Sequence, residues 1–170
     1  MSTLYVDTIN EKTVGNGVQI PGHVVQVVEA VQSSQVAITS SFATFTTIIT
    51  GSITPKFSGS KFIISAALPS YSNNPNGNDW TNSIYIRLYE QEGGGSDSAI
   101  AGYEHPGPKT SMEFSQVIPV LYATGTKSTI QSYTYSIKGV PTVSGDTHYF
   151  GRNSGALDAF SRMVIMEIAQ

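Results

Sequence analysis

The clearest alternation of apolar and polar positions in the chain lies in residues 83–91. The aliphatic residues of this stretch all fall on one side, and its two tyrosines and one arginine fall on the other. A period of two is that of a strand with one buried face, so we predict a strand whose aliphatic side faces the core. β-branched or alternating runs predict further strands at residues 24–31, 45–55, 61–68, 112–123, 128–138, 148–150 and 162–169.

Segments rich in Gly, Pro, Asn and Ser predict the connections between these strands, at residues 32–44, 56–59, 69–82, 92–98, 102–110, 139–146 and 151–158. The short stretch 124–127 predicts a hairpin between strands 112–123 and 128–138. Gly51 predicts either a bulge or a close backbone approach. No segment carries a helical apolar stripe over three turns, so we predict an all-β antiparallel β-sandwich of jelly-roll type.

Two of the predicted strands, 24–31 and 163–168, are apolar on both faces. One face of an antiparallel sheet is ordinarily solvated, so the second apolar face needs a cover. A subunit interface provides one, which favours a homo-oligomer. The alternative is a monomer in which loops or the N-terminal ribbon cover that face.

The N-terminal stretch 3–31 indicates a strand at 3–9, a polar turn at 10–16 and an apolar run interrupted by Pro21 and Gly22. An isolated two-stranded ribbon is marginally stable in water, so this stretch needs a partner in its own chain or in other copies. We therefore divide the chain into an attachment or trimerisation segment at residues 1–22 and a β-sandwich head domain at residues 23–170.

Composition excludes several classes of function. The 170 residues suit one domain, and only 12% of them are charged, against about 25% in a typical domain. A net charge of −3 leaves no basic surface for nucleic acid. The chain has no cysteine, no apolar run long enough for membrane insertion, and an opening unlike a signal peptide. We expect synthesis in a cytoplasm without general secretory export.

The sequence gives no positive indication of an enzyme, a metal site or a cofactor. The three histidines are far apart, without metal-ligand spacing: His23, His105 and His148. The stretch 125–128 lacks the upstream glycine of a phosphate loop. A glycan-cleaving carboxylate pair is the weakest hypothesis, because the candidate carboxylates stand in glycine-rich surroundings: Glu90, Glu92, Asp97 and Glu104.

Carbohydrate binding is the better-supported chemistry. Four aromatic or imidazole side chains stand in predicted loops among Asn, Asp and Gly residues: Tyr71, Trp80, Tyr103 and His105. Aromatic faces stack on sugar C–H faces while amides and carboxylates bond the hydroxyls, so these four residues are the predicted site for a surface glycan. The alternative role of Trp80 is that of an anchor under its own loop.

The opening STLYVDTINEKTVGNGVQIPGHVVQVV resembles the N-terminal segment of tail-fibre and virion appendage proteins of tailed phages, especially marine ones. Ten residues carry the resemblance: Leu4, Val6, Asp7, Thr8, Ile9, Gly17, Val18, Ile20, Pro21 and Gly22. The closing stretch 163–168 is similar to the final strand of the same proteins. The middle is similar only in fold type, which also resembles the trimeric jelly-roll heads of C1q-like and tumour-necrosis-factor-like proteins.

The resemblance implies a homotrimer assembled in a bacterial cytoplasm and incorporated into a virion with other virion proteins. Its N-terminal residues for attachment or trimerisation are Leu4, Val6, Ile9, Val18 and Ile20. The predicted function is a non-enzymatic phage virion structural protein. It would be a short trimeric fibre or knob on tail or capsid that contacts a host surface. The alternative is a carbohydrate-binding, lectin-like module.

Overall fold

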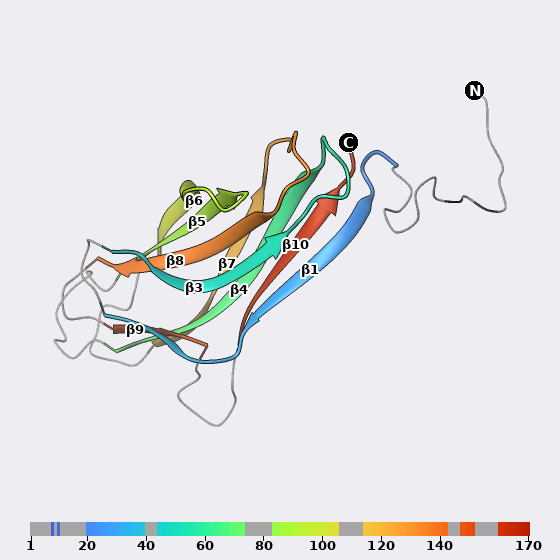
Figure 1. Ribbon diagram of the computed structural model, residues 1–170. Helices are drawn as coiled ribbons and strands as arrows, with labels where there is room; N and C mark the ends of the chain where they lie inside the picture. Colours follow the sequence, from blue (N-terminus) through green and yellow to red (C-terminus); the bar gives the residue numbers. More distant parts are fainter. Residues whose placement is uncertain are drawn as a thin grey trace.

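The computed structural model describes residues 8, 10, 20–39, 44–73, 83–105, 114–142, 147–151 and 160–170. This part of the chain forms two antiparallel sheets that pack face to face (Figure 1). None of the described residues lies in a helix. The predicted all-β antiparallel sandwich is therefore confirmed.

The larger sheet, sheet A, has six strands: β1 (Val24–Gln32), β2 (Val36–Ile38), β4 (Lys61–Asn73), β7 (Phe114–Ala123), β9 (Thr147–Phe150) and β10 (Ser161–Ile168). Sheet B has four: β3 (Thr46–Ile53), β5 (Ile84–Glu92), β6 (Ser98–His105) and β8 (Tyr133–Pro141). The order β1-β10-β4-β7 faces β3-β8-β5-β6, which is the strand order of a jelly roll with two short additional strands.

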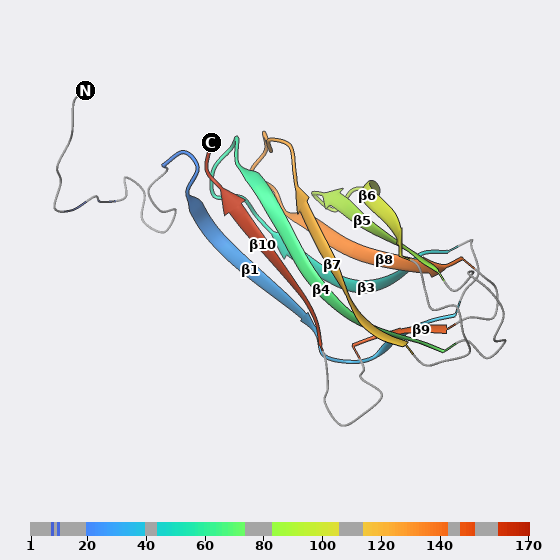
Figure 2. The same cartoon turned by 180° about the vertical axis from the view of Figure 1, so that it is seen from behind.

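The long strand β4 organises sheet A. One side of β4 pairs with β10 along its first half and with β9 along its second half, and its other side pairs with β7. Seen from behind, β7, β4, β10 and β1 follow one another across the sheet, so β7 and β1 are its two long edges (Figure 2).

The core fills the space between the inner faces. The predicted alternation in β5 is confirmed, because its three aliphatic residues are at most 2% exposed: Ile84, Ile86 and Leu88. The Phe62 ring of sheet A meets the rings of Tyr133 and Tyr135 of sheet B edge-on, with centroids 5.7 and 6.0 Å away. Interlocked aromatic rings of this kind contribute packing energy beyond the area that they bury.

Gly51 marks a close approach between the sheets. A Cβ atom at Gly51 would lie 2.9 Å from the Met163 Cε atom and 3.1 Å from the Ala30 Cβ atom. Of the two alternatives that the sequence left open, the close approach is correct, since the bulge in β3 falls between Thr47 and Ile49.

The predicted hairpin between strands 112–123 and 128–138 is wrong. β7 pairs with β4 in sheet A, whereas β8 pairs with β3 and β5 in sheet B. The connecting residues bond to the β3–β4 corner instead: the Thr124 amide donates to the Phe62 carbonyl (2.8 Å), and the Lys127 amide donates to the Ser60 carbonyl (2.8 Å). These bonds carry the chain from one sheet to the other.

Several predicted connections contain strand residues. β2 lies within 32–44, β4 continues through Pro69 to Asn73, and β6 includes the last residue of the stretch 92–98 and the first four of the stretch 102–110. The end of β4 and most of β6 bear small or polar residues, and β2 is only three residues long, so none of these segments shows an apolar alternation. Pairing with β9, β7 and β5 provides their backbone partners.

A buried carboxylate holds one corner of the sandwich. The Glu167 side chain is fully buried and accepts hydrogen bonds from the Lys56 and Phe57 amides (3.0 and 3.2 Å) and from the Ser60 hydroxyl (2.6 Å). The Gln26 side-chain amide donates both to Glu167 (2.6 Å) and to the Thr54 carbonyl (2.6 Å). One carboxylate thus joins β1, β10 and the β3–β4 corner.

We expect Glu167→Ala to lower the free energy of unfolding by about 2–4 kcal/mol, because buried donors left unsatisfied cost about 1–3 kcal/mol each. Glu29→Ala is the matched control on the adjacent strand. It removes only the exposed ion pair with Arg162 (2.6 Å) and should cost about 0–1 kcal/mol. Chemical denaturation measures both, and equal losses would contradict the structural role of Glu167.

Candidate functional site

The outer face of sheet A is apolar from one edge to the other. The pairing register places Val27, Met166, Ile63 and Ala123 in one row across β1, β10, β4 and β7. The next two rows mix aliphatic and polar residues: Val164 and Leu121 share one with Glu29 and Ser65, and Val31 and Ala67 share the other with Arg162. We define the apolar face by Val27, Val31, Ile63, Ala67, Val117, Leu121, Val164, Met166 and Ile168.

Several members of the apolar face are fully open to solvent. Leu121 is 77% exposed and Val117 59% exposed at the β7 edge, while Val27 is 58% exposed at the β1 edge. Soluble monomers rarely expose large contiguous apolar patches, which ordinarily mark interaction sites. This face is therefore the candidate functional site.

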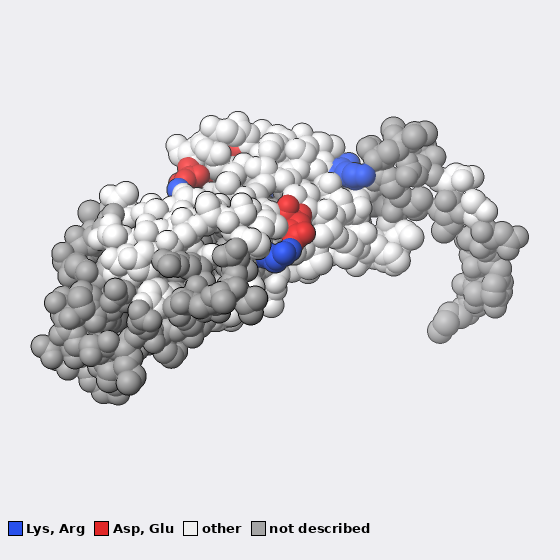
Figure 3. Space-filling model, turned by 90° about the horizontal axis from the view of Figure 1, so that it is seen from below, with Lys and Arg blue, Asp and Glu red and all other residues white. Residues whose placement is uncertain are grey.

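Charged residues are few on the apolar face. Glu29 and Arg162 lie in adjacent rows of β1 and β10 and pair with each other at 2.6 Å. Lys61 stands at the end of the face, in the row of Ile168. Charged side chains are sparse on the described surface seen from below as well (Figure 3). A strongly charged partner would therefore find few charges of the opposite sign on this face.

The outer face of sheet B has the opposite character. Its β3 and β8 strands carry hydroxyl pairs, with Thr50 bonded to Ser136 (2.7 Å) and Ser52 bonded to Thr134 (2.8 Å). Tyrosine, arginine and lysine side chains fill the rest of that face on β5 and β8. Sheet B therefore has the solvated face expected of a sandwich, and sheet A does not.

A slot opens beside the apolar face, between the edge strands β6 and β7. It has a volume of about 240 Å³ and is lined mainly by Ile86, Leu88, Ala101, Val120, Leu121 and Tyr122. The Tyr103 hydroxyl crosses its mouth and donates to the Pro119 carbonyl (2.9 Å). Leu121 belongs both to the apolar face and to the lining of the slot, so the apolar face continues into the slot.

The β7 residues of this face were missed by the sequence reasoning. Residues 117–121 read VIPVL, an apolar run on both faces of a strand. The same two-faced pattern singled out the strands now seen as β1 and β10, so the signal was available. The expectation of a β7–β8 hairpin obscured it.

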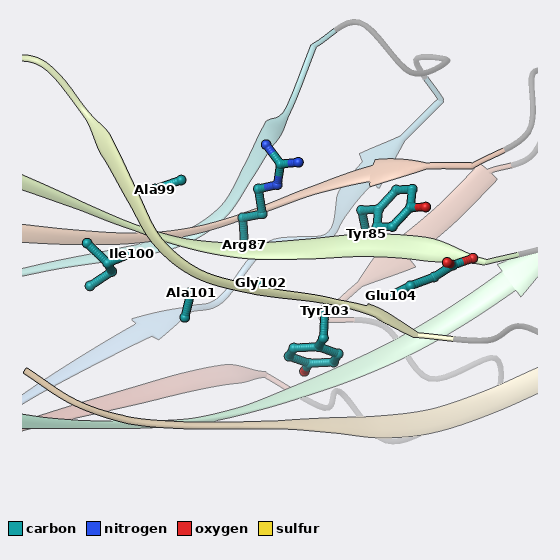
Figure 4. A pocket seen from close by; sticks show the side chains of 8 residues that line it. All are labelled: Tyr85, Arg87, Ala99, Ile100, Ala101, Gly102, Tyr103 and Glu104. Carbon is teal, nitrogen blue, oxygen red and sulfur yellow. The ribbon is translucent and has the colours of Figure 1, made fainter.

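The structure separates the predicted glycan-binding residues. Tyr103 and His105 lie together on β6, with ring centroids 6.5 Å apart, and Tyr103 points away from Tyr85 and Arg87 (Figure 4). Tyr71 lies in sheet A beside Tyr149, at a centroid distance of 5.8 Å. Trp80 lies outside the described residues. The four residues therefore remain a prediction, and the described ones do not share one face.

Of the predicted attachment residues, Leu4, Val6, Ile9 and Val18 lie outside the described residues. Ile20 is described; it is 37% exposed, and its carbonyl accepts a hydrogen bond from the His23 amide (3.0 Å).

The clustered carboxylates are held in structural contacts. Glu90 pairs with Lys127 (2.6 Å) and accepts from the Tyr135 hydroxyl (2.8 Å), while Asp97 pairs with Lys138. Hydrogen bonds to Glu92, first from Thr129 and then from Gln131 and Tyr133, lower the pKa of that carboxyl. Burial raises the pKa of the Tyr135 phenol. These contacts join β5 to the connection before β8.

Within the described ranges, no three His, Asp or Glu side chains are placed to share a metal ion.

The described residues contain no helix that is long and apolar enough to span a membrane.

His148 is a buried histidine in β9, at the end of the sandwich away from the start of β1 and the end of β10 (Figure 1). Its side chain is almost fully buried, and no described residue bonds its Nε2 atom. Burial, assisted by the nearby His105, lowers the pKa of His148 to about 4. The folded protein therefore holds His148 neutral, whereas the unfolded chain would protonate it near pH 6.5.

We predict that the free energy of unfolding decreases as the pH falls from about 6.5 to about 4, by at most about 3 kcal/mol from this group, because the unfolded state gains the proton first. Denaturation at a series of pH values measures the slope. His148→Phe should flatten it, whereas His23→Phe, at an exposed position, should not. An unchanged slope in His148→Phe would contradict this prediction.

No protein-family model matches the chain, and no curated protein matches it. Among solved structures, the chain is similar to a chain in the structure of the infectious bursal disease virus Gx strain. The alignment covers 97% of this chain and 42% of the viral one, at 11% identity and a TM-score of 0.41. The chain thus spans less than half the length of that viral chain, and a likeness at this level identifies neither a family nor an activity.

Proposed function

We propose that this chain is a structural protein of a tailed-phage virion, a short homotrimeric fibre or knob on the tail or the capsid. The observation that carries the proposal is the apolar face of sheet A, opposite a sheet with an ordinary solvated face. Monomeric proteins rarely leave such a face in water, and burial of apolar surface contributes about 25 cal/mol per Å².

A second copy of the chain is the partner that suits this face. Glu29 and Arg162 neutralise each other within one copy, and Lys61 lies only at the end of the face, so most of the area that two identical faces would bring together is uncharged. The exposed aliphatic residues lie at both edges, on β1 and on β7. When the β1 side of one copy meets the β7 side of the next, the contact is head-to-tail, and a rotation of one third of a turn between copies would close it into a three-membered ring. The resemblance at the chain ends supports three copies.

The start of the head supports an attachment role for the N-terminal segment. The chain enters β1 beside the end of β10, where the Gly22 amide donates to the Ala169 carbonyl (2.8 Å) and the Ala169 amide donates to the His23 carbonyl (3.0 Å). The residues that resemble phage appendages lie at and before this point. We propose that they hold the virion while the far end of the sandwich, with β9 and His148, faces outward.

Light scattering coupled to size-exclusion chromatography tests the assembly. We expect a mass near three times the 18.2 kDa of one chain. A mass of one chain at all concentrations would contradict the proposal.

Leu121→Lys tests the interface itself. We expect association to weaken more than about 100-fold, because burial of an unpaired ammonium costs several kcal/mol. The matched control is Ile130→Lys, which places the same charge at another exposed aliphatic residue (60% exposed, against 77% for Leu121), outside sheet A. Equal behaviour of the two variants would remove the apolar face as the interface.

Deletion of residues 2–19 tests attachment. Because β1 begins at Val24, the truncated head should keep its cooperative unfolding and its trimeric mass, yet be lost from assembled particles. Mass spectrometry of purified particles measures the incorporation. Normal incorporation of the truncated chain would contradict the attachment role.

A further inference from the structure

A trough runs along β6 on the outer face of sheet B, the side opposite the apolar face. The register of β5 and β6 sets large side chains against small ones: Arg87 stands opposite Gly102, and Tyr89 opposite Ala99. Tyr85 stands opposite Glu104, which ends the row. The hollow along β6 has a volume of about 420 Å³, and its lining also includes Ala101 and Tyr103, which point to the other side of β6. Figure 4 shows both sides. The hollow lies along β6, which is an edge strand of sheet B.

Gly102 leaves the trough open because it has no side chain. A Cβ atom there would lie 2.9 Å from the Arg87 Cγ atom and 3.2 Å from the Ile86 carbonyl oxygen. Any side chain at this position would displace Arg87 and fill the hollow. The glycine therefore lets the Arg87 stem lie over the β6 backbone.

The walls offer one cation and one anion that do not neutralise each other. The Arg87 guanidinium stacks over the Phe45 ring, 4.5 Å from its centroid, and the described part of the chain gives it no carboxylate at ion-pairing distance. The Glu104 carboxylate lies beside the Tyr85 phenol, and its charge and hydrogen bond raise the pKa of Tyr85. Arg87 and Glu104 thus stand on either side of the Tyr85 ring.

We infer that this trough binds a neutral pyranose sugar, with the Tyr85 ring against a C–H face of the sugar. A hydroxyl group can accept from the Arg87 guanidinium while a neighbouring hydroxyl donates to the Glu104 carboxylate, and such charge-assisted bonds are the strong ones. A charged ligand would meet attraction from one wall and repulsion from the other, whereas the hydroxyls of a neutral sugar can bond to both. The site goes beyond the assembly role, because it uses no residue of the apolar face.

Saturation-transfer difference NMR on the full-length protein tests the site. The probes are the methyl glycosides of glucose, galactose and mannose, with glycerol as a diol that has no ring. We expect transfer to the ring protons of at least one glycoside and none to glycerol. Tyr85→Ser and Gly102→Val should weaken binding by at least about tenfold, which corresponds to one bidentate bond or stack of about 1.4 kcal/mol. Thr47→Ser, on β3 of the same sheet, is the matched control and should bind like the parent.

The results that would contradict the sugar site can be told apart from one another. Absence of transfer to all three glycosides would overturn the proposal, as would equal transfer in the parent and Tyr85→Ser. Stronger transfer to N-acetylneuraminic acid would overturn the choice of a neutral ligand. If Gly102→Val fails to fold, Tyr85→Ser and Arg87→Gln, which change only surface side chains, decide the matter. Light scattering on the same variants separates this result from the assembly, because their masses should match the parent whether or not the sugar binds.

Discussion

The position of β1 depends on the buried Glu167 carboxylate. The segment between β3 and β4 has to carry the chain from sheet B to sheet A, and its turn leaves amide groups without strand partners. Glu167 satisfies two of these amides and the Ser60 hydroxyl, and it binds Gln26 of β1 at the same time. Because a buried carboxylate needs several donors around it, Glu167 couples the stability of the corner to that of the two terminal strands.

The fold class was predictable because the alternating strands report directly on burial. In β5 the aliphatic side faces the core, and the two-faced pattern of β10 places Ile165 inside and Val164 on the outer face. β6 was not predictable in the same way. Its outer positions include Gly102 and Ala99, which are small because they form the trough floor, and glycine in a strand resembles a loop.

The path between the sheets could not be read from local sequence. A short polar stretch such as 124–127 suits a hairpin within one sheet as well as an arch between two. The choice is made by bonds to distant residues, including the Thr124 hydroxyl, which accepts from the Phe62 amide (2.9 Å). The extent of the candidate site could not be predicted from local sequence either. The two-faced strands predicted an interface, but the extent of the apolar face over β4 and β7 follows from the order of strands, which local patterns do not contain.

The antiparallel pairing of β1 with β10 has a mechanical consequence. The chain enters at the same end at which β10 finishes, so a load applied through residue 20 and resisted at the far end of the head runs along the axis of β1. Such a load shears the ladder from Val24 to Gln32, and all of its backbone bonds resist together instead of opening one by one. In the proposed attachment through the N-terminal segment, the head would transmit tension from that end to its distal end while its fold stays intact.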